Sequence, residues 1–201
     1  MTPADPWENT IVDTHRGGDG YRDFLAAFRD LLDAASAADA PEPEWAALAT
    51  VMQEAADRLS SWGAPERSQP AGSRFDLPGR GHPYLLPFVP TTSTPDEVRG
   101  TVVFRRAHLG GNGAAHGGTI PLLFDEILGH LSNDGERPIA RTAYLTVNYR
   151  QITPINRLLH LDATVDRQEG RKRWVSGRLR DGNTLVADAD GLFVELRPGQ
   201  P

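Results

Sequence analysis

Asn112–Gly129 reads NGAAHGGTIPLLFDEILG and decides the fold. Beyond its glycine cluster, apolar residues recur at the i, i+3, i+4, i+7, i+8 and i+11 positions of one helical face: Ile120, Leu123, Phe124, Ile127, Leu128 and Leu131. Leu122 lies on the other side, so the helix is apolar nearly all round and we expect it to be buried. Pro121 fits its first turn, where backbone N–H groups lack intrahelical partners anyway, and this places the helix start near Gly117.

Downstream of this helix, the apolar spacing changes to alternation. Thr142–Arg150 alternates polar and apolar residues, which is typical of a strand. Two short strands before the helix and three longer ones after it complete the predicted set: Tyr84–Val89, Gly100–His108, Leu158–Arg167, Trp174–Arg180 and Thr184–Leu196. Turn residues separate the last three, so we expect an antiparallel meander. The pattern predicts an α+β domain in which a curved antiparallel sheet wraps one central helix.

Two amphipathic helices are predicted upstream, as an N-terminal hairpin. One begins at Tyr21, and the other runs from Trp45 to Trp62 with apolar residues at alternating steps of three and four, followed by Gly63 as a stop. Apolar stripes at helical spacing normally mean burial. We therefore interpret the hairpin as a packing or oligomerisation arm and not as a catalytic element.

Length and composition fit one main domain with some appended structure. We divide the chain into an N-terminal helical extension (1–63), a linker rich in Pro, Gly, Ser and Arg (64–83) and the main domain (84–201). The formal net charge of -6 at pH 7 argues against nucleic-acid binding. No apolar stretch approaches the roughly 20 residues that span a bilayer, and the first residues lack the apolar core of a signal peptide, so we expect a soluble cytoplasmic protein without a membrane partner.

Several classes of chemistry are excluded by residue type and spacing. The chain contains no cysteine, so it has neither thiolate nucleophiles nor cysteine metal ligands. No two histidines have metal-binding spacing, and we expect no metal site and no cofactor. Gly111-Asn112-Gly113 hints at a dinucleotide fingerprint, but His116 stands where the third glycine belongs. No G-x-S-x-G motif occurs, which disfavours a serine hydrolase.

The glycine pair and an acid on the helix are the candidate functional residues. A glycine pair that opens a buried helix exposes N–H groups and a partial positive charge, which stabilises an anion by up to about 2 kcal/mol. A carbonyl oxygen could approach the N–H of Gly117 as in an oxyanion hole; alternatively, Gly117 and Gly118 serve only close helix packing. Asp125 lies about 140° around the helix from Ile120, beyond the apolar stripe. It is either a functional acid or, like Glu126 beside it, a solvent-facing one.

Asn112–Gly129 resembles the signature of the hotdog-fold thioesterases, especially the branch that contains the phenylacetate-pathway and human thioesterase-superfamily proteins. Thr142–Arg150 resembles the next strand of that branch, so the likeness covers about residues 84–197 and leaves out the helical extension. It implies a hotdog fold and hydrolysis of an acyl-CoA thioester. It also implies that Gly117 polarises the carbonyl, with Gly118 beside it at the substrate, and that Asp125 acts as general base or nucleophile.

This chemistry predicts a dimer. Eight residues of helix rise about 12 Å, so Gly117 and Asp125 of one chain cannot both reach the same carbonyl carbon. If two central helices run antiparallel across a two-fold axis, Gly117 of one protomer meets Asp125 of the partner subunit, giving two equivalent sites. The resemblance implies the same arrangement, and we expect a homodimer or a dimer of dimers. The alternative is a non-catalytic hotdog module that binds acyl-CoA or only a partner protein.

Other polar residues are secondary candidates. The resemblance implies that Thr142 holds the acid or the attacking water and that Asn112 binds the carbonyl. His116 either hydrogen-bonds to the loop or borders the thioester. Arg150 lies at a predicted strand end, and Arg171 and Arg173 lie in a predicted hairpin turn. These three arginines could bind the phosphates of CoA; alternatively, they are solvated surface charges.

Overall fold

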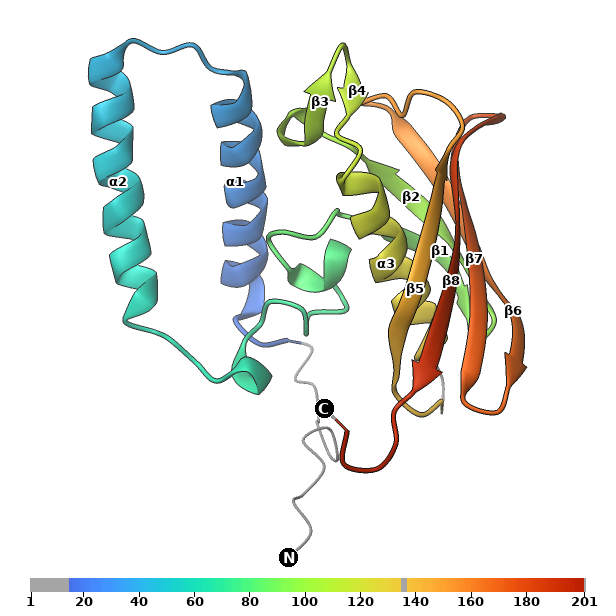
Figure 1. Ribbon diagram of the computed structural model, residues 1–201. Coiled ribbons are helices and arrows are strands. Elements are labelled where there is room, and N and C mark those ends of the chain that lie inside the picture. The colour runs from blue at the N-terminus through green and yellow to red at the C-terminus, as the bar shows by residue number, and fades with distance from the viewer. Residues whose placement is uncertain (1–14, 135–136, 201) are drawn as a thin grey trace, which may run out of the picture.

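A six-stranded antiparallel sheet forms the body of the protein in the computed structural model, which describes residues 15–134 and 137–200 (Figure 1). The strand order is β1-β2-β6-β7-β8-β5. The strands are β1 (Val89–Thr94), β2 (Glu97–Val103), β5 (Ala140–Tyr149), β6 (Leu158–Glu169), β7 (Lys172–Asp181) and β8 (Thr184–Glu195). A short hairpin, β3 (Leu109–Gly111) and β4 (Ala114–Ala115), precedes the central helix α3 (Thr119–Ser132). The predicted hotdog architecture, a curved antiparallel sheet around one helix, is confirmed.

The core lies between α3 and the sheet. All six residues predicted for the apolar face of α3 are buried, and they pack with inward-facing residues of β2, β6, β7 and β8. A Cβ on Gly177 of β7 would lie 3.1 Å from Leu128 and 3.2 Å from Phe124. Because these contacts are tighter than ordinary packing, glycine at this position lets the helix approach the strand closely. The helix begins at Thr119, two residues after the expected start.

Strand β5 occupies one end of the sheet and has an open edge. It pairs with β8, and no described strand pairs with its other side. Leu145 and Val147 pack partly against the core, whereas Tyr144 and Tyr149 are exposed aromatic side chains. An open edge with exposed aromatic residues beside it is a surface on which another chain can pair.

The two predicted strands before the helix are partly wrong. Residues 84–88 do not form a strand: Pro87 removes a backbone donor from this stretch, Pro83 and Pro90 flank it, and β1 begins only at Val89. The second strand lies earlier than predicted, at Glu97–Val103, and a short 3-10 helix η3 (Arg106–His108) follows it. The three predicted C-terminal strands are confirmed within a few residues.

The N-terminal extension forms the two predicted helices, α1 (Gly18–Ala37) and α2 (Glu42–Ser60). Helix α1 is anchored to the body: Leu25 is buried, and the Tyr21 hydroxyl donates to the carbonyl of Gly81 at 2.6 Å. Arg105 also pairs with Asp30 at 2.7 Å. Helix α2 runs beside α1 but is separated from the body, and none of its residues is buried by the described chain (Figure 1). None of the described helices is both long and apolar enough to cross a membrane.

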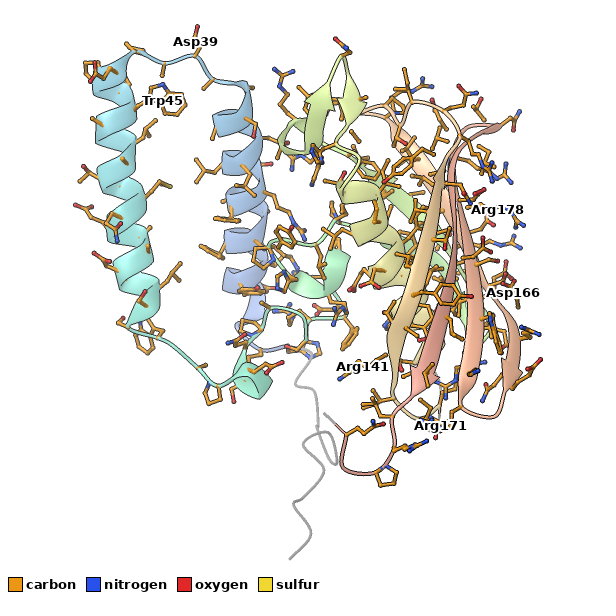
Figure 2. All side chains as sticks on the ribbon, in the orientation of Figure 1. Asp39, Trp45, Arg141, Asp166, Arg171 and Arg178 are labelled. Atoms are coloured by element: carbon orange, nitrogen blue, oxygen red, sulfur yellow. The ribbon has the colours of Figure 1, made fainter. Side chains whose placement is uncertain are left out.

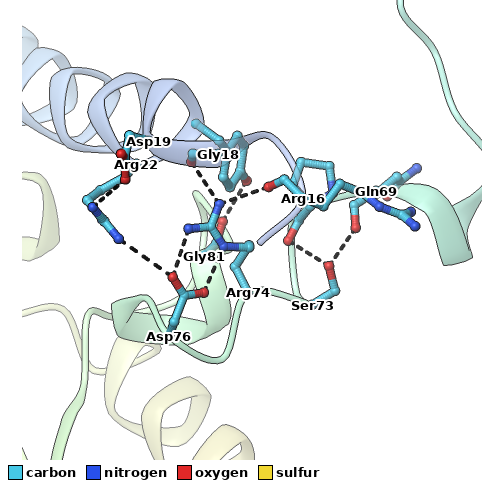
Figure 3. Close-up of polar contacts among 11 residues, drawn as sticks. Arg16, Gly18, Asp19, Arg22, Gln69, Ser73, Arg74, Asp76 and Gly81 are labelled. Atoms are coloured by element: carbon cyan, nitrogen blue, oxygen red, sulfur yellow. Dashed lines mark hydrogen bonds and ion pairs between the residues drawn. The ribbon is translucent and has the colours of Figure 1, made fainter. Parts of the chain in front are cut away.

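Residues 64–83 contain more buried structure than a linker needs. Arg74 is 1% exposed and donates to both carboxylate oxygens of Asp76, at 2.7 and 2.8 Å (Figure 3). It also donates to the carbonyls of Arg16 and Gly18. The hydrogen bonds from Arg74 hold the pKa of Asp76 below its usual value, although burial opposes this. The segment therefore ties α1 to the body, and the division into extension, linker and main domain stays a prediction.

Candidate functional site

Asp125 and Thr142 meet at the point where α3 faces the start of β5. The Thr142 hydroxyl donates to Asp125 Oδ1 at 2.9 Å. Both residues are exposed in the single chain, and no other described residue donates a hydrogen bond to the Asp125 carboxylate. One carboxylate oxygen is thus oriented by Thr142, and the other is available to accept a proton or to attack.

An open pocket of about 360 Å³ adjoins this pair. Its walls come from the second half of α3, the start of β5 and the segment before β1: Phe75, Arg80, Asp125, Glu126, Gly129, His130, Asn133, Ile139, Ala140, Arg141, Thr142 and Phe193. The rings of Phe75 and His130 stack with centroids 5.7 Å apart. The pocket thus combines an aromatic wall with charged groups next to the candidate acid.

Glu126 is not the surface acid that we expected. Its side chain is 16% exposed and is held by two hydrogen bonds from the Arg80 guanidinium, one of them from Nη2 at 2.8 Å. The two neighbouring acids therefore have different environments. Glu126 is neutralised by a cation of the preceding segment, whereas Asp125 faces no cation within hydrogen-bonding distance among the described residues.

The loop before α3 leaves one backbone donor free. The Gly118 N–H donates to His116 Nδ1 at 3.0 Å, and the Tyr149 hydroxyl donates to the Gly117 carbonyl at 2.8 Å. The Gly117 N–H has no acceptor among the described residues. His116 therefore uses its Nδ1 to hold the loop, and the Gly117 N–H, unlike that of Gly118, is available to a ligand oxygen.

Gly117 and Asp125 do not share a site within one chain. The pocket beside Asp125 is not lined by Gly117, and the two residues lie at opposite ends of about two helical turns. Asn112 is separate from both. It occupies the tip of the β3–β4 hairpin with φ of 50°, followed by Gly113 with φ of 76°. Positive φ at two successive turn residues favours an Asn-Gly pair, so a turn explains Asn112 without any ligand.

The arginine predictions need correction. Arg173 lies in β7 and not in a turn; it is 0% exposed and donates to the carbonyls of Ser132 and Pro138, both at 2.8 Å. It cannot reach a CoA phosphate. Arg171 does lie in the β6–β7 turn, where it donates to the carbonyl of Glu195 at 2.7 Å. Figure 2 shows Arg171 at the end of the sheet.

Arg150 remains at the surface but already has an anionic partner. It follows β5 and pairs with Asp188 at 2.9 Å. Burial raises the pKa of Asp188, but hydrogen bonds from Arg150 and Asn148, together with the charges of Arg150 and Arg178, hold it below its usual value. Asp188 thus stays ionised and neutralises Arg150, so any phosphate contact by Arg150 would compete with this pair.

Three further contributors to the site were missed: Tyr149, Arg80 and Phe75. Tyr149 lies inside a strand that the sequence pattern did predict, but its contact with Gly117 joins residues 32 positions apart. The Arg80–Glu126 contact joins residues 46 positions apart. Nothing in the local spacing reveals such pairs.

Comparison with known proteins gives a consistent picture. No family model matches the chain. Acyl-coenzyme A thioesterase THEM4 of Bos taurus is 32% identical over 88 residues, 43% of this chain and 35% of that protein. PA0474 of Pseudomonas aeruginosa, whose name describes an esterase, is 31% identical over 120 residues, 57% of this chain and 89% of that protein. The chain thus spans about a third of the length of the bovine relative.

The solved structures show a similarity that extends beyond the sheet. The crystal structure of protein RHA08564, a thioesterase superfamily protein, matches with a TM-score of 0.74 and 25% identity, and covers 87% of this chain and 90% of that one. The predicted main domain, residues 84–201, accounts for a smaller share of the chain than the 87% that this match covers. At least part of the N-terminal segment therefore belongs to the shared structure.

Proposed function

Because the chain belongs to the hotdog-fold thioesterase family, we propose that it hydrolyses acyl-CoA thioesters to the free acid and CoA. The observation that carries the proposal is the Asp125 carboxylate, which Thr142 holds through one oxygen at the mouth of an open pocket. A carboxylate with a free oxygen beside a pocket suits a general base or a nucleophile.

The proposed reaction uses two groups on the thioester. The Gly117 N–H donates to the carbonyl oxygen and stabilises the negative charge that develops there. The Asp125 carboxylate then acts in one of two ways. As a base it takes a proton from water, whose oxygen attacks the carbonyl carbon; the C–S bond breaks and the CoA sulfur receives the proton. As a nucleophile it attacks that carbon itself; the C–S bond breaks, and CoA leaves as a thiolate that takes a proton from solvent. Water then hydrolyses the resulting anhydride to the free acid and regenerates the Asp125 carboxylate.

We propose that each site contains Gly117 of one protomer and Asp125 of the partner subunit. The separation of the two residues within one chain supports this, since Gly117 precedes α3 and the six residues from Thr119 to Asp125 rise about 9 Å. The open edge of β5 supports it too, because Asp125, Thr142 and the exposed Tyr144 and Tyr149 all lie at or near that edge. A second copy across this edge would cover them and would complete two equivalent sites.

A panel of acyl-CoA thioesters tests the proposal directly. The chain is incubated with short and long aliphatic and with aromatic acyl-CoA, and the released thiol is followed with a chromogenic disulfide. We expect turnover with at least one class of acyl group. Because the chain has no cysteine, the thiol signal comes only from CoA. Thermal stabilisation by acyl-CoA without release of thiol from any member would instead favour the non-catalytic binding module.

Thr142 should act as a positioning residue for Asp125. We expect Thr142→Val to lower kcat about 10- to 100-fold, since a hydrogen bond to a charged group contributes about 1.5–3 kcal/mol. Thr142→Ser keeps the hydroxyl and should retain most of the activity. Steady-state kinetics of both variants, with Tm as the folding control, checks this. Equal losses in the two variants would contradict this role, because Thr142→Ser keeps the hydroxyl that donates to Asp125.

A further inference from the structure

Helix α2 carries an apolar stripe that the described chain leaves uncovered. The large apolar side chains along the stripe and next to it are all exposed, Leu59 by 53% and Trp62, two residues after the helix ends, by 80%: Trp45, Leu48, Val51, Met52, Leu59 and Trp62. Figure 2 shows Trp45 on the side of α2 that faces α1. Helix α1 adds Phe24 and Leu32, which are also exposed. A helix with this much apolar surface needs a partner, because leaving it in water forgoes the burial that stabilises such helices.

The uncovered stripe borders a groove between the two helices. The groove has a volume of about 600 Å³ and is lined by Phe24 of α1, by Val51, Ala55 and Leu59 of α2 and by Trp62 just after it, together with the charged Glu54 and Arg58. Figure 1 shows α1 and α2 side by side with a gap between their ribbons. Polar residues occupy the opposite face of α2, where Gln53 hydrogen-bonds to Asp57. The groove is thus apolar on the inside and polar on the outside.

The spacing of the stripe identifies the occupant as a helix. Trp45, Leu48, Met52, Ala55, Leu59 and Trp62 follow one another at steps of three, four, three, four and three. This alternation is the heptad pattern, in which side chains of one helix fit between those of another. The described chain offers no third helix to this groove, because α3 is buried against the sheet.

The amount of apolar surface fits a stable interface with a second copy. Together, the eight apolar side chains named above expose an apolar surface area on the order of 700 Å². The largest apolar patch of a monomer is normally about 300–600 Å², and a standard interface buries about 800 Å² per partner. A second copy brings the same heptad stripe and the same groove, so the two surfaces complement each other across a two-fold axis.

We propose that the groove between α1 and α2 receives α2 of a second copy of this chain, so that two α1–α2 arms pack as a four-helix unit. Each α2 is then both the inserted helix and one wall of the partner's groove. The arms join a different copy from the one across the open edge of β5, so that two dimers assemble into a tetramer and loss of the arm contact halves the mass. No residue of the Asp125 site takes part, so the inference does not depend on the proposed hydrolysis.

Cysteine crosslinking provides the first test. Because the natural chain has no cysteine, Val51→Cys introduces a single thiol. Val51 is the midpoint of Glu42–Ser60, so antiparallel pairing of α2 with its copy places the two thiols close together. Mild oxidation should convert most of the protein to a covalent dimer. Gln53→Cys, about 160° away around the helix, is the matched control and should crosslink far less.

Assembly mass provides the second test. Leu48→Glu combined with Leu59→Glu places charges in the stripe and should halve the mass measured by sedimentation velocity, relative to wild type. Gln53→Glu on the polar face should leave the mass unchanged. Circular dichroism should show a folded sheet in all variants, because none of these side chains is buried by the described chain. Asp125→Asn should sediment like wild type, and Val51→Cys combined with Asp125→Asn should crosslink like Val51→Cys alone, so failure of the hydrolysis proposal would not be mistaken for failure of this one.

Two outcomes would overturn the inference. If Val51→Cys crosslinks no better than Gln53→Cys, α2 does not lie against its copy. If the double glutamate variant has the same mass as wild type, the stripe is covered within one chain or by another kind of partner.

Discussion

Asp125→Asn should lower kcat for acyl-CoA hydrolysis about 10²- to 10⁴-fold, the usual contribution of a positioned proton-transfer group. The amide has nearly the same shape, and its oxygen can still accept the hydrogen bond from Thr142 that the carboxylate accepts at 2.9 Å. What it lacks is the negative charge, so it can neither take a proton from water nor attack the acyl carbon. Steady-state kinetics of thiol release measures the loss.

The neighbouring acid serves as the comparison. Glu126→Gln removes a carboxylate from the same helical turn, but that carboxylate is already neutralised by Arg80. We expect the loss of kcat in Glu126→Gln to be at least about tenfold smaller than in Asp125→Asn. Acyl-CoA should raise the Tm of Asp125→Asn as it raises that of wild type, because the substitution leaves the pocket in place. A larger loss in Glu126→Gln would transfer the proposed role to Glu126.

The central helix could be predicted from sequence because its pattern is local. Six apolar residues at helical spacing predict a buried helical face without any knowledge of the rest of the chain, and all six are buried. The strand predicted over residues 84–89 failed for an equally local reason, since three prolines within eight residues outweigh the apolar character of the stretch. The turns between the last three strands were recognisable because each contains a glycine, and Gly170 and Gly182 adopt positive φ, of 54° and 56°.

The environments of charged residues could not be predicted in this way. Arg173 looked like a turn residue beside Arg171, but it is buried because two carbonyls, 41 and 35 positions away, accept its hydrogen bonds. Glu126 looked like a surface acid because its partner Arg80 belongs to a segment without periodic pattern. The burial of a charge depends on which partner the fold brings to it, and that is a property of the tertiary structure.

The Asp125–Thr142 contact differs both from the central helix, which a local pattern predicts, and from the charge environments, which no pattern predicts. The residues are 17 positions apart, in different elements, so no spacing rule joins them. The resemblance to a known signature suggested the pair, and the structure brings the two side chains together. The roles of both residues in catalysis stay predictions until the variants are measured.

Two inactive variants should together form an active enzyme. Gly117→Pro lacks the N–H that would polarise the carbonyl, and proline there breaks no hydrogen bond of the described chain, because that N–H has no acceptor in it. Asp125→Asn lacks the carboxylate. If each site combines Gly117 of one protomer with Asp125 of the partner subunit, a hybrid dimer of the two variants contains one intact site and one doubly defective site.

The hybrid should therefore have about half of the wild-type kcat per dimer, whereas each variant alone has almost none. Co-expression with two different affinity tags and sequential purification isolates the hybrid for kinetics. Recovery also shows that the Gly117→Pro chain folds, since an unfolded chain could not supply Asp125. A hybrid as inactive as its parents, with both chains folded by circular dichroism, would mean that the two residues act within one chain or not at all. The helix geometry argues against action within one chain, because the amide lies before the start of α3 and about 9 Å of helix rise separates Thr119 from the acid.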